Sequence, residues 1–344
     1  MQTIRLGRTE IAVTKTAFGA LPVQRRTKAD GVRILRRAYE AGITFFDTAR
    51  AYSDSEEKLG MAFSPAERAN IVIATKTGAG NAATLRAHLE TSLRMLQTEW
   101  IDIYQLHNPS FVPVPGGADG IYDTLLAAKA EGKIKHIGIT NHRPSVAREA
   151  VESGLYDTLQ FPFCMLSGPE ELSLVALCKE RDVGFIAMKA LSGGLITNAR
   201  AAFAFMQTQE NVVPIWGIQH MHELEEFIGY AQSPPVLDDE LISAIEADKK
   251  ALADDFCRGC GYCLPCPAEI ELHMAARMYY LVTRSPYKPL ISKAAQAKMA
   301  RIDSCVDCGA CKSRCPYGLD SAALAKKQYA LYKDFVAAHA DEVE

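Results

Sequence analysis

The sequence predicts an α/β protein, built as a (β/α)8 TIM barrel with an N-terminal β-hairpin and followed by a smaller, mainly helical domain. Two observations support this prediction. Between residues 13 and 230, short apolar and β-branched runs alternate with amphipathic stretches of helical length. Beyond that region, eight of the ten cysteines fall between Cys257 and Cys315. A long alternating region that gives way to a cysteine-rich one indicates two domains of different kinds.

The alternating region contains eight strand-like runs and eight helix-like stretches. The runs span residues 14–21, 43–47, 71–76, 101–107, 134–141, 158–161, 183–189 and 212–217. The helical stretches span residues 28–41, 55–63, 84–96, 121–131, 145–153, 170–181, 199–207 and 222–230. Continuous apolar strands that alternate with helices form a parallel sheet covered by those helices, and eight such units close a barrel. A doubly wound open sheet is the alternative, but no G-x-G-x-x-G turn follows the first run.

The segments flanking the barrel set the domain limits. Before the first barrel strand, TIRL and EIAV flank Gly7-Arg8-Thr9, which predicts a hairpin that caps the barrel bottom. A Ser-Pro-Pro break at residues 233–235 ends the barrel pattern. We therefore expect a barrel over residues 1–236, a linker helix over 237–256 and a helical cysteine domain over 257–344.

Composition excludes several classes of function. The 344 residues carry a net charge of −3, so there is no basic excess to bind nucleic acid. No apolar run is long enough for a membrane span, and the N-terminus lacks the apolar core of a signal peptide. We therefore expect a cytoplasmic protein. In that reducing compartment, clustered cysteines bind metals more often than they form disulfides.

Polar residues stand at the ends of several predicted barrel strands, and three of them suggest catalysis. Asp47, Lys76 and His107 end consecutive strands, and Tyr52 follows Asp47 by five residues. The carboxyl ends of barrel strands converge on the mouth, where barrel enzymes keep their active sites. A phenol has a pKa of about 10, and we expect a neighbouring Lys76 to lower it. Tyr52 and His107 would then hydrogen-bond to an oxygen whose carbon accepts a hydride.

This set of four residues, with its FDTAxxY spacing, resembles the aldo-keto reductase superfamily over residues 1 to about 230. The resemblance implies a catalytic tetrad of Asp47, Tyr52, Lys76 and His107. It also implies that Thr140 and Asn141, in GITNH, line a nicotinamide pocket and that Gln160 contacts the carboxamide. Cys164 follows nearby, and a substrate contact is one hypothesis for it. Cys178 is interpreted as a small hydrophobic residue of a helix.

The resemblance gives a weaker indication of the nucleotide cofactor. At the family's positions for the adenosine phosphate and adenine, this sequence has Gly217, Glu223, Glu226 and Phe227, of which only Glu226 matches. The carboxylate of Glu223 would repel a 2′-phosphate, so NADP(H) is disfavoured, while NAD(H) or no nicotinamide stays open. Two interpretations of the turn after the seventh run are equally supported. Lys189, Gly193 and Gly194 either receive a pyrophosphate or form a simple flexible loop.

Two cysteine runs dominate the C-terminal domain. The first is C-x2-C-x2-C-x2-C-P and the second is C-x2-C-x2-C-x3-C-P. Three closely spaced thiolates hold one iron–sulfur cluster, and the distant Cys before Pro reaches the other cluster. A zinc site would need only two cysteines from each run. We assign one [4Fe-4S] cluster to Cys257, Cys260, Cys263 and Cys315, and the second to Cys305, Cys308, Cys311 and Cys266.

A barrel of this type followed by two ferredoxin-like runs resembles the iron–sulfur subgroup of aldo-keto oxidoreductases across the whole chain. The leading hypothesis is an oxidoreductase that acts on a small carbonyl or hydroxyl substrate and exchanges electrons through its clusters, with a redox partner such as ferredoxin. Three alternatives stay open. The chain is a redox-initiated lyase or isomerase, an electron-transfer subunit whose barrel only binds a ligand or partner, or an ordinary NADH-linked reductase with structural clusters.

Overall fold

The computed structural model describes residues 1–252, 256–284 and 287–342, which form two compact units. The first unit contains Met1–Ala190 and Phe203–Leu237, and the second contains Leu191–Ala202 and Asp238–Glu344. Parts of the expected linker helix (residues 253–255) and of the expected cysteine domain (residues 285–286 and 343–344) lie outside the described residues.

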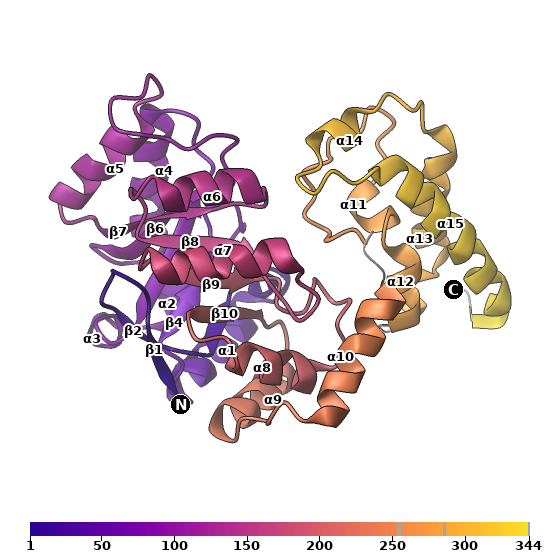
Figure 1. The fold of residues 1–344 in the computed structure, drawn as a ribbon, viewed down its shortest axis with the longest axis horizontal. Helices are drawn as coiled ribbons and strands as arrows, with labels where there is room; N and C mark the ends of the chain where they lie inside the picture. Colours follow the sequence, from indigo (N-terminus) through magenta and orange to yellow (C-terminus); the bar gives the residue numbers. More distant parts are fainter. Residues whose placement is uncertain (253–255, 285–286, 343–344) are drawn as a thin grey trace. The chain divides into compact units, whose positions relative to one another are not determined.

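The first unit is a closed barrel of eight parallel strands, as the sequence predicts (Figure 1). The strand order around the barrel is β10-β3-β4-β5-β6-β7-β8-β9. The strands are β3 (Ala17–Gly19), β4 (Phe45–Asp47), β5 (Val72–Thr77), β6 (Ile101–His107), β7 (Ile134–Thr140), β8 (Thr158–Pro162), β9 (Gly184–Met188) and β10 (Val212–Gly217). Because neighbouring strands are parallel and follow one another in the chain, all their carboxyl ends lie at one mouth.

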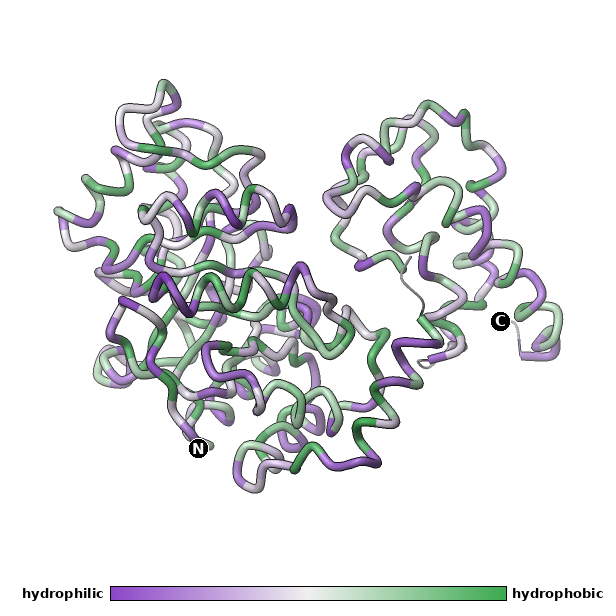
Figure 2. Tube along the Cα trace, viewed as in Figure 1, coloured by the Kyte–Doolittle hydropathy of each residue, from purple (hydrophilic) through white to green (hydrophobic). Residues whose placement is uncertain are grey.

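Helices cover the outside of the barrel. They are α1 (Lys28–Glu40), α2 (Ser55–Ala62), α3 (Pro65–Arg68), α4 (Ala82–Met95), α5 (Ile121–Ala130), α6 (Pro144–Glu152), α7 (Pro169–Glu180), α8 (Ala199–Gln207) and α9 (Met221–Gln232), with a 3-10 turn η1 at Pro22–Arg25. Hydrophilic and hydrophobic residues alternate along several of them (Figure 2), as amphipathic helices require. The short α3 was not expected from the sequence. Ser64 and Glu67 form its capping box, and a proline occupies its first turn.

The barrel interior is apolar at the bottom and polar at the mouth. Side chains of one strand point alternately inward and outward. The inward set at the bottom forms a single buried cluster that includes Ala17, Phe45, Ala74, Ile103, Ile186 and Val213. Leu6 and Val13, from the antiparallel hairpin of β1 (Thr3–Arg5) and β2 (Ala12–Thr14), join this cluster. The hairpin therefore closes the bottom, and the inward positions that remain, nearer the mouth, carry the polar residues.

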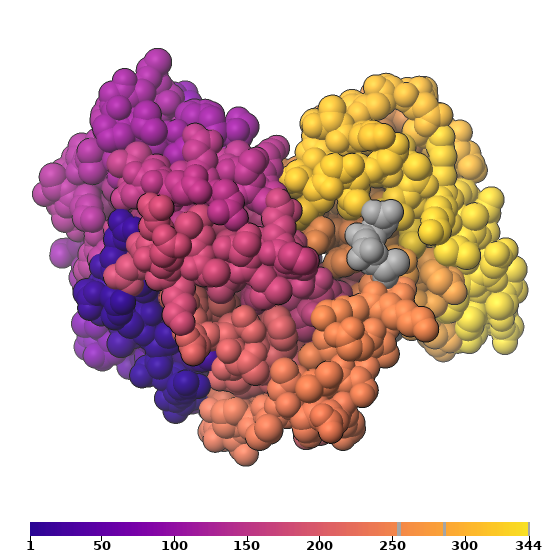
Figure 3. All heavy atoms as spheres, in the orientation of Figure 1, coloured from indigo at the N-terminus to yellow at the C-terminus, as the bar shows by residue number. Residues whose placement is uncertain are grey.

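The second unit is mainly helical. Its elements are α10 (Asp239–Leu252), α11 (Leu272–Ala275), α12 (Met278–Arg284), η2 (Lys288–Leu290), α13 (Lys293–Ala300), η3 (Arg301–Ser304), α14 (Ala310–Arg314), α15 (Ser321–Ala338) and η4 (Ala340–Glu342). Residues near the C-terminus form much of its visible surface (Figure 3). Its core joins aliphatic and aromatic side chains, such as Ile270, Val282 and Tyr332, to three of the cysteines. The cysteines therefore belong to the packing of this unit.

The loop after β9 packs with the second unit, which the sequence did not indicate. Arg284 donates to the carbonyl oxygen of Leu195 at 3.1 Å and to the carboxylate of Asp248 at 2.7 Å. Arg277 donates to the carbonyl oxygen of Gly193. These bonds explain why Leu191–Ala202 is grouped with the later residues. None of the helices in the described part of the chain has the length and apolar content needed to cross a bilayer.

Candidate functional sites

A buried ion pair lies at the centre of the barrel mouth. The Lys76 ammonium donates to the Asp47 carboxylate at 2.6 Å and to the carbonyl oxygen of Thr48 at 2.8 Å. Both side chains are almost completely buried. They meet because β4 and β5 are neighbours and both residues point inward near the ends of their strands. Burial raises the pKa of Asp47 and lowers that of Lys76, and the attraction between the two groups opposes both shifts.

Two glutamine side chains complete the hydrogen bonding of Asp47. Gln105 donates to the second carboxylate oxygen of Asp47 at 3.2 Å and to the amide oxygen of Gln160 at 2.9 Å. Gln160 in turn lies 3.5 Å from Asp47. The sequence analysis missed Gln105, although it stands two residues before His107 and so shares the inward face of β6. Gly138 makes room for it, since a Cβ there would lie 2.9 Å from the Gln105 side chain.

Tyr52 and His107 lie beside this pair. The Lys76 ammonium is 5.3 Å from the centre of the Tyr52 ring. The Tyr52 and His107 rings meet edge to face, with centres 5.9 Å apart. The structure thus brings together all four residues of the expected tetrad.

Burial determines the protonation of both rings. It raises the pKa of Tyr52, and the negative charge of Asp47 raises it further. This direction is opposite to the expected one, because the charge of Lys76 is directed at Asp47 and the phenol is desolvated. Burial also lowers the pKa of His107 to about 3, and the positive charge of Lys76 contributes. At neutral pH the site therefore presents a protonated phenol and an uncharged imidazole, both of which can donate a hydrogen bond.

The loop that carries Tyr52 is fixed by a second buried acid that the sequence analysis missed. Glu56 is 1% exposed, pairs with Arg50 and accepts a hydrogen bond from the Thr75 hydroxyl at 2.7 Å. The backbone N–H of Arg50 also donates to the Lys76 carbonyl oxygen at 3.0 Å. Residues on both sides of Tyr52 are therefore tied to β5, the strand that carries Lys76.

The residues expected to contact a nicotinamide are differently engaged. The Asn141 amide donates to the Pro109 carbonyl oxygen at 2.8 Å, and its oxygen accepts from the N–H groups of His142 and Arg143. Thr140 is the last residue of β7, and its hydroxyl lies 3.9 Å from the sulfur of Met188. Lys189 follows β9 and has a positive φ of 59°. Thr140 ends β7 and pairs with Gln160 of the neighbouring β8, and Asn141 follows Thr140, so the three residues lie on one side of the mouth.

The start of α9 is occupied by the chain itself. The Glu223 carboxylate accepts from the N–H groups of Gln219 at 2.7 Å and His220 at 2.8 Å. Glu226 accepts from the Tyr230 hydroxyl, and Phe227 is buried against Trp216. An internal carboxylate therefore satisfies backbone donors that would otherwise favour an external anion. Gly217 ends β10 and is exposed.

Four cysteines of the second unit lie close to one another. None of the eight cysteines described in this unit forms a disulfide bond. Burial raises the pKa of the Cys257 thiol, and its neighbours Cys260 and Cys315 add to the shift. Burial likewise raises the pKa of Cys263 to about 12, with contributions from Cys257 and Cys260. Such effects act between near neighbours, so Cys257, Cys260, Cys263 and Cys315 lie close together, and we call them the first quartet.

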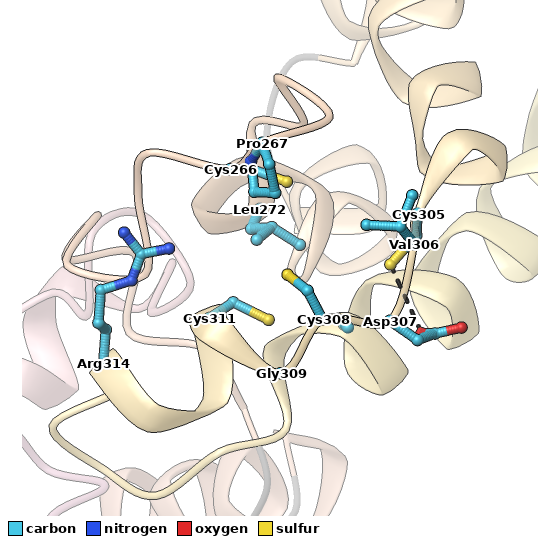
Figure 4. Close-up of a pocket in the computed structure, with 11 residues that line it drawn as sticks. Cys266, Pro267, Leu272, Cys305, Val306, Asp307, Cys308, Gly309, Cys311 and Arg314 are labelled. Atoms are coloured by element: carbon cyan, nitrogen blue, oxygen red, sulfur yellow. Dashed lines mark hydrogen bonds between the residues drawn. The ribbon is translucent and has the colours of Figure 1, made fainter.

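The other four cysteines line one pocket. Cys266, Cys305, Cys308 and Cys311, which we call the second quartet, surround it together with Arg314 (Figure 4). The sulfur atoms of Cys308 and Cys311 point into the space between them, and that of Cys305 lies 3.5 Å from the carboxylate of Asp307. Cys311 also contributes to the pKa of Cys263, so the two quartets adjoin.

The donor set and its surroundings fit iron–sulfur clusters. Within residues 1–252, 256–284 and 287–342, no three His, Cys, Asp or Glu side chains close around a point as they would around a single ion. A [4Fe-4S] cluster is held by four Cys thiolates, and each quartet supplies four cysteines. A buried polar atom also stands unsatisfied beside the first quartet. Among the described residues, the Nε of Arg277 has no hydrogen-bond partner.

Comparisons with known proteins agree with both units. The aldo/keto reductase family model matches residues 15–202, and the model of a 4Fe-4S dicluster domain matches residues 256–320. A probable aldo-keto reductase of Glycine max is 29% identical over 216 residues, which cover 56% of this chain and 60% of that protein. The L-galactose dehydrogenase of Arabidopsis thaliana is 30% identical over 215 residues, which cover 56% of this chain and 66% of that protein.

Solved structures agree with the fold. An aldo-keto reductase from Bacillus halodurans superposes with a TM-score of 0.64 at 21% identity, and the match covers 72% of this chain and 96% of that one. The chain therefore spans somewhat less than two thirds of the length of the first curated relatives and nearly all of this solved barrel. The resemblance to aldo-keto reductases and to a two-cluster domain is confirmed.

Proposed function

Because the chain belongs to the aldo/keto reductase family and carries a 4Fe-4S dicluster domain, we propose that this oxidoreductase interconverts a carbonyl and a hydroxyl group at the barrel mouth and exchanges electrons through two [4Fe-4S] clusters. The observation that carries the proposal is the buried Asp47–Lys76 pair, with Tyr52 and His107 beside it.

In the reductive direction, the substrate carbonyl oxygen binds between Tyr52 and His107. The uncharged imidazole donates a hydrogen bond and orients the oxygen. As the carbonyl carbon accepts a hydride, its oxygen gains negative charge and takes the phenolic proton of Tyr52. The hydride and the proton together convert the carbonyl to an alcohol. Tyr52 is left as a phenolate, which is reprotonated from solvent.

Lys76 makes this proton transfer feasible despite the raised pKa of Tyr52. Its ammonium lies near the ring, so it stabilises the phenolate once the proton has left. Asp47 and the Thr48 carbonyl oxygen hold the ammonium in place. Asp47 also holds Gln105 and, through it, Gln160, so one carboxylate orients several groups of the site.

The hydride donor that the family uses is a reduced nicotinamide. We place its ring against Thr140, Asn141 and Gln160, and its pyrophosphate by Lys189. The adenosine would lie near Gly217 and Glu226. The Glu223 carboxylate lies among backbone donors at the start of α9. It disfavours the extra phosphate of NADP(H), so NAD(H) is the nucleotide that this proposal favours.

Clusters held by the two quartets would each carry one electron at a time, so two such transfers would balance one hydride. We propose that each quartet holds one cluster, and that a small redox protein such as ferredoxin exchanges electrons with them. A second candidate function follows from the same pair of one-electron sites. A single electron given to a bound hydroxy-carbonyl substrate would start a lyase or isomerase reaction, in which Tyr52 and Lys76 move protons.

Anaerobic purification followed by optical titration with NADH, NADPH and dithionite tests the proposal. We expect two clusters per chain, bleaching by dithionite, and binding of NADH in preference to NADPH. Bleaching by dithionite without nucleotide binding would instead favour the redox-initiated reaction. Cluster loss in air with retained NADH-linked activity would assign the clusters a structural role.

Replacing Tyr52 with Phe tests the proton donor. The variant keeps the ring and loses the hydroxyl, so we expect reductase activity to fall by about 10²–10⁴-fold. The visible spectrum of the clusters should be unchanged. Activity at the wild-type level would contradict the tetrad. An electron-transfer subunit, whose barrel only binds a ligand, would show no loss of electron transfer in this variant.

A further inference from the structure

Arg277 is a buried cation beside the first quartet. It stands immediately before α12 and is 5% exposed. Burial lowers the pKa of its guanidinium, and the sulfur of Cys257 acts in the opposite direction. One guanidinium nitrogen donates to the Gly193 carbonyl oxygen, whereas the Nε has no partner among the described residues. Burying a cation is costly unless a negative group compensates it.

Two glycines make space for this guanidinium. Gly259, between Cys257 and Cys260, has a positive φ of 62°, and a Cβ there would lie 2.1 Å from a guanidinium nitrogen of Arg277. Gly193 has a φ of 64°, and a Cβ there would lie 3.0 Å from the same nitrogen. The backbone between two proposed ligands therefore lies directly against the charged end of Arg277.

The second quartet has no comparable buried cation among the described residues. Arg314 lines its pocket but is only half-buried, and it donates to the Pro265 carbonyl oxygen at 2.7 Å. Lys326 is exposed and paired with Asp307 at 2.7 Å. Water screens both of these charges, so each acts on a nearby group less strongly than a buried one does.

We propose that Arg277 raises the reduction potential of the cluster held by the first quartet, so that the two clusters of the chain differ in potential. The inference rests on the proposed assignment of the four cysteines as ligands. When that cluster accepts one electron from a reductant, it gains one negative charge, and a fixed positive charge beside it stabilises the reduced state. Arg277 and two of the proposed ligands, Cys257 and Cys263, are buried, so solvent weakens this interaction less than it would at the surface.

Potentiometric titration with dithionite, followed by electron paramagnetic resonance, tests this inference on the full cluster-loaded chain. The variants are Arg277→Gln, which removes the charge, and Arg277→Lys, which keeps it. Arg314→Gln is the matched control at the second quartet. In Arg277→Gln, we expect the reduced fraction of one cluster, relative to its oxidised fraction, to fall by about tenfold or more at a fixed potential. Arg277→Lys should retain most of the wild-type ratio.

The outcomes separate this inference from the ligand assignment. Unmoved potentials in Arg277→Gln, or equal shifts of both clusters, would overturn the role of Arg277. A shift of equal size in Arg314→Gln would overturn the argument from burial. Loss of the first cluster in Arg277→Gln but not in Arg277→Lys would support a role for the positive charge. Loss of the cluster in both variants would contradict that role. Iron and sulfide contents of the wild-type chain below two clusters would instead contradict the ligand assignment itself.

Discussion

The two proposed sites differ in how their buried polar groups are satisfied. At the barrel mouth, each charge has an internal partner, since Lys76 pairs with Asp47 and Gln105 donates to the other carboxylate oxygen. In the second unit, Arg277 donates to the Gly193 carbonyl oxygen, whereas its Nε has no hydrogen-bond partner among the described residues. Within the described part of the chain, the Oε1 of Gln105 also lacks a partner at the mouth, but the charged groups there are paired. In the second unit, we expect a bound cluster to compensate Arg277.

The difference between the two sites indicates how each unit is stabilised. A barrel of eight strands buries a large apolar core, so its polar mouth adds chemistry to a fold that is already stable. The second unit has a smaller core, into which Cys257, Cys263 and Cys311 are packed. In small metal-binding domains, the free energy of metal binding is also free energy of folding.

Removal of iron should therefore have the largest effect and should act on one unit only. Treatment with a chelator and a reductant is expected to unfold the cysteine unit, which lowers the helical circular dichroism and exposes residues 257–342 to protease. Both tryptophans, Trp100 and Trp216, lie in the first unit, so their fluorescence should keep its folded value. A second unit that resisted protease after iron removal would show that its core suffices without clusters.

Breaking the ion pair of the barrel should have the next largest effect. In Asp47→Asn, the Lys76 ammonium stays buried without its counterion, so we expect the free energy of unfolding of the barrel to fall by about 3–5 kcal/mol. Denaturation followed by tryptophan fluorescence measures it. The double variant Asp47→Asn with Lys76→Met removes both charges and should lose less than the single variant. A double variant as unstable as the sum of its parts would show that the two groups are not coupled.

The same contrast explains what the sequence predicted well. Asp47, Lys76 and His107 could be brought together from the sequence because the ends of parallel strands in a closed barrel always converge. Three cysteines of each quartet could be grouped from their local spacing, and the distant fourth came from the two-cluster pattern; their role as ligands stays a prediction. Gln105 could have been predicted, because it stands two residues before His107 and shares the inward face of β6. A polar residue in the middle of a strand does not, however, by itself indicate that its side chain points inward.

Other features depend on tertiary structure and had no local signal. Arg277 lies in an ordinary helical stretch, and its partner Gly193 is 84 positions away in the chain. The sequence predicted a lowered pKa for Tyr52, and this prediction was wrong for a related reason. The sequence shows which charges are neighbours, but desolvation depends on the full packing around the phenol. Likewise, the loop after β9 belongs to the second unit through contacts that no motif marks.

Acid should weaken the barrel through His107. Its pKa lies at about 3 in the folded chain and at about 6.5 in the unfolded chain, so between these values only the unfolded state binds the proton. The stability that His107 contributes by staying uncharged is therefore fully present above pH 6.5. It is lost as the pH falls from 6.5 toward 3. Between pH 7 and 5, we expect wild type to lose about 2 kcal/mol more than His107→Gln. The exposed His222→Gln serves as the control and should behave as wild type, with tryptophan fluorescence as the measurement.

The smallest effect is expected at Glu223, where an internal carboxylate occupies the start of α9. Replacing Glu223 with Ala leaves the N–H groups of Gln219 and His220 to water, so the barrel should lose about 1 kcal/mol. Glu226→Ala, a nearby exposed change that leaves those groups paired, is the matched control and should lose less.

The same substitution tests the predicted preference for NADH over NADPH. Removing the Glu223 charge abolishes repulsion of a 2′-phosphate and frees two backbone donors for it. Affinity for NADPH, measured by fluorescence titration, should therefore rise relative to NADH in Glu223→Ala and stay unchanged in Glu226→Ala. The clusters belong to the other unit, so their potentials should not move in either variant. Equal NADPH affinities in the two variants would show that the nucleotide does not approach α9, and the barrel would then take its electrons by another route.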